Sequence, residues 1–219
     1  MPVIINQIKG NLDESEDSIV KKALKYAGVK KSDILNYGIN KVSLDARHQD
    51  NIHFVYSVFV NAASEKTELK MVEKPDCRYV RNSNFTPEIS GRNKEGEIVI
   101  AGFGPAGMFC GLVLAEYGYK PLILERGKSV DERVESVKKY WLGGELDTES
   151  NVQFGEGGAG TFSDGKLTTR INDPLCRYVL EKFVEFGAPE EILVKAKPHI
   201  GTDNLRNIVK TLREHIIFL

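Results

Sequence analysis

The stretch of sequence that decides the fold is residues 97–127, which read EIVIAGFGPAGMFCGLVLAEYGYKPLILERG. It opens with an apolar run at 98–101, of the kind found in strands buried on both faces of a parallel sheet. A glycine-rich turn follows, then an apolar helix from about 105 to 117, and then a second apolar run that ends at Glu125. This order of strand, turn, helix, strand and carboxylate predicts a βαβ unit that binds a dinucleotide.

Each glycine of the turn GFGPAG has a separate predicted role. Gly102 permits the tight turn, Gly104 lets the backbone approach a pyrophosphate, and Gly107 lets the helix pack closely on the strand. The start of the helix supplies unpaired N–H groups and a partial positive charge, which suit a pyrophosphate. Glu125 stands where a ribose-binding acid is expected. Arg126 could pair with the 2′-phosphate of NADP, but the neighbouring acid disfavours an NADP site.

A second glycine-rich segment, residues 151–170, reads NVQFGEGGAGTFSDGKLTTR. Glycines leave backbone amides accessible, so such a loop can form an anion-binding nest or line a flat ring. A flexible surface linker is the alternative interpretation. Phe154, Phe162 and Leu167 argue against it, because a solvated linker has little use for large apolar side chains at that density. The composition therefore favours a cofactor loop.

Taken together, the segments GFGPAG…LERG and FGEGGAGTFSDGKL resemble the FAD-binding signature of a family of bacterial, largely uncharacterised FAD-dependent dehydrogenases in the glutathione-reductase-like flavoprotein group. PHIGTDNL at 198–205 is also similar to that family's pattern. The resemblance runs from the N-terminal module to the last residue, and it implies FAD rather than NAD. It implies a cofactor site made of Gly102, Phe103, Gly104, Pro105, Ala106, Gly107, Glu125, Arg126, Gly157, Gly158, Ala159, Gly160, Thr161, Ser163 and Lys166.

The activity implied by the resemblance is that of an oxidoreductase that transfers hydride through the flavin N5, with NAD(P)H as a candidate electron donor. The substrate would be a small molecule that the sequence does not identify. Lys166 could stabilise reduced, anionic flavin, or it could be a surface lysine. His199 is a candidate for acid–base chemistry by its residue type, but a structural histidine beside a turn is favoured. The sequence names no catalytic acid or base.

Composition sets further bounds. Thirty basic and 31 acidic side chains give a net charge of −1, so no strong signal for binding nucleic acid is present. The sequence shows no secretion signal and no apolar stretch of membrane-spanning length, which predicts a cytoplasmic protein that does not bind membranes. The three cysteines lack a CxxC pair, which disfavours a metal site and a disulfide reductase. Cys110 lies one turn into the nucleotide-binding helix, and its thiol is expected to be buried.

We expect residues 1–84 to form a small α+β module with a βαββ, ferredoxin-like order, built from a strand at 3–8, a helix at 16–27 and strands at 41–47 and 51–60. Residues 85–96 read as a linker. Residues 97–219 are expected to be the N-terminal part of an α/β, Rossmann-like domain for FAD or NAD(P). The partner of the first module is not indicated.

Three later helices are predicted in the second domain. The charged helix at 130–141 should bury Val134, Val137 and Trp141. Arg133 of this helix could face the nucleotide, but a surface position is favoured. Another helix begins at Pro174 and ends near residue 187. A last helix follows residue 202, and residues 216–219 are either its final turn or the start of a strand.

One βαβ unit does not complete a flavin domain, and members of the resembled family are much longer. We therefore expect this chain to be an N-terminal portion of a longer enzyme. Two alternatives remain open. The first is an NAD-binding dehydrogenase or regulatory module, which would be colourless. The second is a noncatalytic nucleotide-binding or interaction protein, whose first ninety residues would contact RNA or a partner protein.

Overall fold

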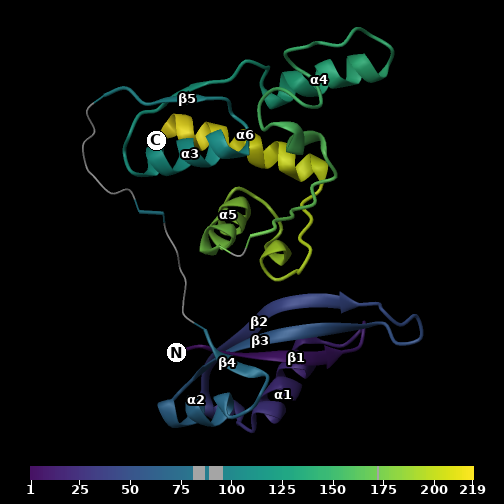
Figure 1. The fold of residues 1–219 in the computed structure, drawn as a ribbon, viewed down its shortest axis with the longest axis vertical. Coiled ribbons are helices and arrows are strands. Elements are labelled where there is room, and N and C mark those ends of the chain that lie inside the picture. The colour runs from purple at the N-terminus through teal and green to yellow at the C-terminus, as the bar shows by residue number, and fades with distance from the viewer. Residues whose placement is uncertain (81–86, 89–95, 172) are drawn as a thin grey trace. The chain divides into compact units, whose positions relative to one another are not determined.

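The computed structural model describes residues 1–80, 87–88, 96–171 and 173–219. Two compact units make up the chain: Met1–Asn84 with Leu193–Pro198, and Phe85–Ile192 with His199–Leu219. The predicted linker at 85–96 lies outside the described residues except for positions 87, 88 and 96. The first unit contains an antiparallel sheet and the second a parallel pair of strands, so the chain is mixed α/β (Figure 1).

The first unit has the element order βαββαβ. Its elements are β1 (Val3–Gly10), α1 (Glu16–Ala27), a 3-10 turn (Lys31–Asp33), β2 (Ile34–Asp45), β3 (His53–Ala62), α2 (Glu65–Val72) and β4 (Cys77–Tyr79). The strand order in the sheet is β2-β3-β1-β4, and all neighbours are antiparallel. Strand β3 therefore lies between β1 and β2 and splits the βαβ unit. The sequence predicted the first four elements in order but neither α2 nor β4.

Local signals define the helix α1. The Ser15 side chain accepts a hydrogen bond from the Ser18 amide at the N-terminus, and Gly28 ends the helix with a φ of 70°. The helix buries one stripe of residues against the sheet: Ile19, Val20, Ala23, Leu24 and Ala27. Met71 of α2 and Val58 of β3 join the same core with no exposed surface.

A segment distant in sequence, Leu193–Pro198, belongs to this first unit. The Val42 amide of β2 donates to the Val194 carbonyl over 2.8 Å, and the Ala196 amide donates to the Val42 carbonyl over 2.8 Å. The segment thus forms a short parallel bridge with β2. No local pattern indicated this pairing, and the expected domain at 97–219 included the segment.

The second unit begins with a βαβ unit. Its elements are β5 (Val99–Ala101), α3 (Pro105–Glu116), β6 (Leu122–Leu124), α4 (Val130–Trp141), a 3-10 turn η2 (Ala159–Phe162), α5 (Pro174–Glu185), a 3-10 turn (Glu190–Leu193) and α6 (Thr202–Phe218). Strands β5 and β6 are parallel, with Val99 opposite Leu122. Helices α3 and α6 pack side by side (Figure 1). Because α6 continues to Phe218, residues 216–218 are its last turn.

The β5–β6 pair is covered by α3 on one face. Ile100 is buried, and a Cβ at Gly111 of α3 would lie 2.7 Å from Cδ1 of Ile123. The other face carries Val99, Leu122 and Leu124, which are 54%, 46% and 54% exposed. Parallel strands are normally covered on both faces, so this apolar face is unusually open among the described residues.

Three expectations about side-chain burial in helices were wrong. Cys110 is exposed, because α3 buries the stripe Met108, Gly111, Leu112 and Ala115 and Cys110 lies off it. In α4, Val137 is buried as expected and Val134 is only half-buried, but Trp141 is 64% exposed at the helix end. The expectation of a surface position for Arg133 was also wrong, since this residue has no exposed surface.

Candidate functional site

The turn between β5 and α3 has the geometry that its glycines suggest. Gly102 has a φ of 93°, and its amide donates to the Leu124 carbonyl over 2.7 Å, which joins the turn to the end of β6. A Cβ at Gly107 would lie 2.0 Å from the Gly102 carbonyl oxygen. A Cβ at Gly104 would meet nothing within 4 Å. The turn is therefore tight on its inner side and open at Gly104, where α3 begins with Pro105.

The second glycine-rich segment packs directly on this turn. The Gly157 amide donates to the Phe103 carbonyl over 2.8 Å. A Cβ at Gly158 would lie 3.2 Å from Cδ of Pro105 and 3.5 Å from Cα of Gly104. Thus the structure brings together the backbone of two segments that the sequence singled out separately, beside the first residues of α3.

Beyond Gly158 the loop turns into η2, which contains Ala159, Gly160 and Thr161. Thr161 is buried, and its hydroxyl lies 3.5 Å from the Glu156 carbonyl oxygen, to which it donates. A Cβ at Gly160 would meet nothing within 4 Å, so the backbone here faces open space.

The Glu125 carboxylate is held by backbone amides. The Phe103 amide donates to Oε2 over 2.7 Å, and the Gly127 amide donates to Oε1 over 2.8 Å. Each carboxylate oxygen has a second lone pair that can accept another hydrogen bond. The two amides therefore fix the orientation of the acid at the end of β6 without exhausting its capacity to accept hydrogen bonds.

Arg126, which was considered as a partner for a 2′-phosphate, instead pairs with Glu149. Its Nε lies 2.7 Å from Glu149 Oε2, and its guanidinium lies 5.4 Å from the centre of the Phe154 ring. Both charged side chains are more than half exposed, so the pair contributes little to stability. Nevertheless, the guanidinium of Arg126, the residue next to Glu125, already has a carboxylate partner.

The later part of the predicted cofactor loop is tied to the region where α6 begins. Thr202 Oγ1 donates to the Ser163 carbonyl over 2.5 Å, and Ser163 Oγ donates to the Gly160 carbonyl over 2.7 Å. Lys166 forms an isolated antiparallel bridge with His199. The Lys166 ammonium is 72% exposed and lies 2.7 Å from Asp164, whose carboxylate raises the lysine pKa. Of the two interpretations, the geometry favours a surface lysine.

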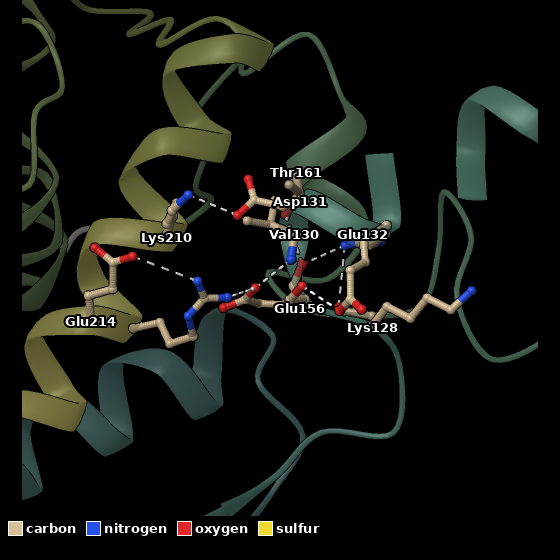
Figure 2. A network of polar contacts seen from close by, with 12 residues as sticks. Lys128, Val130, Asp131, Glu132, Glu156, Thr161, Lys210 and Glu214 are labelled. Atoms are coloured by element: carbon tan, nitrogen blue, oxygen red, sulfur yellow. Dashed lines mark hydrogen bonds and ion pairs between the residues drawn. The ribbon is translucent and has the colours of Figure 1, made fainter. Parts of the chain in front are cut away.

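Glu156 lies at the junction of the loop, α4 and α6 (Figure 2). Only 3% of this residue is exposed. Its Oε2 accepts hydrogen bonds from the Val130 amide, the first of α4, and from Arg213 Nη1 of α6 over 2.6 Å. Its Oε1 is buried and has no hydrogen-bond partner among the described residues. Burial raises the pKa of the Glu156 carboxyl, while the Val130 amide and Arg213 oppose that shift.

Arg133 of α4 is the functional candidate that the sequence analysis placed on the surface in preference to the nucleotide site. It is fully buried and donates hydrogen bonds to backbone carbonyls of the glycine-rich segment, those of Asn151, Val152, Gly155, Glu156 and Gly158. A signal that could have indicated this is the presence of one arginine on the same helical stripe as Val130 and Val137.

A cavity of about 680 Å³ adjoins this junction within the second unit. Its polar lining includes Glu125, Lys128, Glu156 and Arg213, whereas Ile123 and the last residues of α6 supply apolar surface. The volume falls within the range of small-molecule sites. The described residues contain no group of three or more His, Cys, Asp or Glu side chains placed to hold a metal ion. Nor does any helix in the described ranges have the length and apolarity needed to cross a membrane.

Comparison with known proteins gives two similarities. Residues 1–61 match the model of a family described as a domain of unknown function, DUF8436. Over 217 residues the chain is 45% identical to an uncharacterised protein of Clostridium beijerinckii. The aligned region covers 99% of this chain and 41% of that protein. The chain therefore spans well under half of the length of this relative. It is similar along nearly its whole length to part of a longer clostridial protein, and both glycine-rich segments fall outside the family match.

Proposed function

We propose that this chain is the N-terminal, cofactor-binding portion of an FAD-dependent oxidoreductase, with the FAD pyrophosphate at the start of α3. In this proposal the second unit begins a Rossmann-like FAD domain, and the first unit is a ferredoxin-like module. The single observation that carries the proposal is the packing of the second glycine-rich segment on the first, through the Gly157–Phe103 hydrogen bond.

The shape of the site fits a dinucleotide. The backbone is open at Gly104 and at Gly160, so a pyrophosphate can approach both segments without meeting a side chain. The first amides of α3 have no acceptors within their own helix, and they and the helix dipole favour an anion. These donors come from the backbone, so the site needs no lysine.

The chemistry beside the turn fits an unphosphorylated ribose. Glu125 is oriented by two amides and can still accept hydrogen bonds from ribose hydroxyls. Arg126 is paired with Glu149 rather than free for a 2′-phosphate. The choice of FAD over NAD rests on the resemblance of the FGEGGAGTFSDGKL segment, and the packing of that segment on the turn is compatible with it.

When bound, a flavin supplies hydride transfer at N5, and NAD(P)H is the proposed electron donor. The residues of this chain would bind the pyrophosphate at 102–107 and 157–160 and orient the adenosine ribose through Glu125. The small-molecule substrate and the partner of the first unit are not assigned.

The test is a titration, with FAD and separately with NAD⁺, of the purified longer protein of which we propose this chain to be the N-terminal portion, followed by flavin fluorescence and by calorimetry. We expect FAD to bind, and Gly104→Val to weaken this binding without lowering the thermal midpoint of the unliganded protein, because the position is open. Binding of NAD⁺ in preference to FAD would support the NAD-binding alternative. Binding of neither ligand would refute a dinucleotide site.

A further inference from the structure

We propose that Arg133 is a positioning residue for this dinucleotide site: its buried guanidinium fixes the glycine-rich segment and, through that segment, the turn between β5 and α3. The inference rests on the proposed function and assigns a role to a residue outside both glycine-rich motifs.

The environment of Arg133 is unusual for a cation. It has no exposed surface, and none of the described acidic side chains forms an ion pair with it. Nε donates to the Asn151 carbonyl over 2.8 Å, and Nη2 donates to the Val152 carbonyl over 3.0 Å. The guanidinium also lies 4.7 Å from the centre of the Phe162 ring. Carbonyl dipoles and an aromatic face thus replace the water that an arginine normally keeps.

Nη1 makes the contacts that reach the site. It donates to the carbonyls of Glu156 and Gly158 over 2.6 and 2.8 Å, and to that of Gly155 over 3.3 Å. A Cβ at Gly155 would lie 2.7 Å from Cδ of Arg133, so the loop fits this side chain closely. The loop backbone is therefore shaped around one guanidinium.

A continuous chain of hydrogen bonds leads from Arg133 to the turn. The peptide group between Glu156 and Gly157 accepts from Arg133 at its carbonyl and donates from its N–H to the Phe103 carbonyl. The Phe103 amide in turn donates to Glu125 Oε2. Both groups proposed to meet the cofactor, the turn and the ribose-binding acid, are thus linked to Arg133 through a single peptide group of the loop.

The charge of Arg133 persists in this setting. Burial lowers the pKa of the guanidinium to about 10, while Glu125 and Glu156 raise it. The residue is therefore protonated at neutral pH and keeps all its donors. Lysine at this position would keep the charge but would have only three donors and no planar fork, so it can satisfy part of the carbonyl set.

In the same longer protein, the experiment compares the wild type with Arg133→Met, Arg133→Lys and a control, Arg177→Met, which changes an exposed arginine of α5. Affinities for FAD, ADP and adenosine are measured, together with thermal midpoints and hydrogen exchange of the amides at 102–104 and 151–161. We expect Arg133→Met to weaken FAD and ADP by about ten- to a hundredfold, as for loss of a charged hydrogen bond. Adenosine affinity should fall by less than ADP affinity, because Glu125 keeps its second anchor, the Gly127 amide. Arg133→Lys should recover part of the loss, and the control should match the wild type.

Several outcomes would overturn the inference. Unchanged FAD and ADP affinity in folded Arg133→Met would do so, and so would an equal loss for adenosine and ADP, which indicates a general structural role. If Arg133→Met does not fold, the Arg133→Lys variant provides the test. An Arg133→Lys protein with the ADP affinity and the hydrogen exchange at 102–104 of the wild type would contradict the inference. Failure of the wild type to bind FAD or ADP would defeat the proposed function instead. Exchange at 102–104 would then still show whether Arg133 fixes the turn.

Discussion

Arg213 Nη1 lies 2.6 Å from Glu156 Oε2 and donates to it, and this bond joins α6 to the glycine-rich segment at the start of α4. The same carboxylate oxygen accepts the Val130 amide, so one acid serves two helices. It is an anion at a helix N-terminus and also half of a largely buried ion pair. The two roles can be separated by substitution.

Glu156→Ala should destabilise the protein by about 1–3 kcal/mol, because it leaves Arg213 and the Val130 amide without their acceptor in a buried setting. Glu156→Gln keeps an acceptor oxygen and should cost less. Denaturant unfolding at neutral pH measures both. Equal losses for the two variants would contradict a requirement for the acceptor.

The pH dependence of stability follows from the direction of the Glu156 pKa, which burial raises above its usual value of 4.5. A raised pKa means that the residue's contribution to stability is complete below the unfolded value and is lost as pH rises through the folded value. The stability of the wild type relative to Glu156→Gln should therefore fall as pH increases from about 4 towards neutrality. Urea unfolding of both proteins at a series of pH values tests this. If the stability of the wild type relative to Glu156→Gln rose with pH, the pKa of Glu156 would be lowered by folding and the prediction would be wrong.

Substitution by alanine should destabilise the protein at one glycine of the turn and have little effect at another. Gly107→Ala places a Cβ 2.0 Å from the Gly102 carbonyl oxygen, so we expect a loss of about 1–3 kcal/mol, as for overpacking. Gly104→Ala adds a Cβ in open space at a φ of −77°, and its effect on unliganded stability should stay within about 0.5 kcal/mol. Thermal unfolding of both variants makes the comparison. Similar midpoints would show that α3 can move away from the strand at little cost.

The three cysteines should be alkylated at different rates in the folded protein. Cys110 is exposed, Cys176 is half-buried and Cys77 is buried, and burial raises the pKa of the Cys77 thiol to about 11. Only about a thousandth of Cys77 would be thiolate at pH 8, so Cys110 should react with iodoacetamide first and Cys77 last. Mass spectrometry of peptides after timed alkylation gives the order. In denaturant the differences should disappear, and rapid native labelling of Cys77 would count against its burial.

Helix α2 offers a matched pair of core and surface substitutions. Met71 has no exposed surface, whereas Leu69 is 53% exposed. Met71→Ala should cost about 2–5 kcal/mol through lost burial and a residual cavity, and Leu69→Ala should stay within about 0.5 kcal/mol. Denaturant unfolding, followed through the transition of the first unit, gives the change in the free energy of unfolding for both variants. Comparable losses would mean that α2 packs through a different face.

Local signals were enough to predict much of the framework. The bounds of α4 agree with the prediction, and those of α1 follow from a serine cap and a terminal glycine. The need for glycine at two positions of the turn is also local. Gly102 has a positive φ, and a Cβ at Gly107 would clash with the Gly102 carbonyl oxygen. Such features depend on neighbours close in the chain, so sequence pattern carries them.

What could not be predicted depends on distant partners. Arg133 sits in a charged helix and looks like a surface residue, because its partners are carbonyls of a later loop that have no side-chain signature. Trp141 fits the apolar stripe of α4, but it is exposed at the last turn of that helix. The bridge between Val42 and Lys195 joins segments that no periodicity connects.

The carbonyl cage around Arg133 has a consequence for the order of folding. The loop at 151–158 cannot take its final shape until α4 presents the guanidinium, whereas α4 can form from local interactions. We therefore expect helix α4 to form before the loop during refolding. Substitutions in the loop should speed unfolding and leave the refolding rate nearly unchanged, which a kinetic comparison of Gly155→Ala with the wild type would measure. A slowed refolding rate would place the loop in the folding nucleus instead.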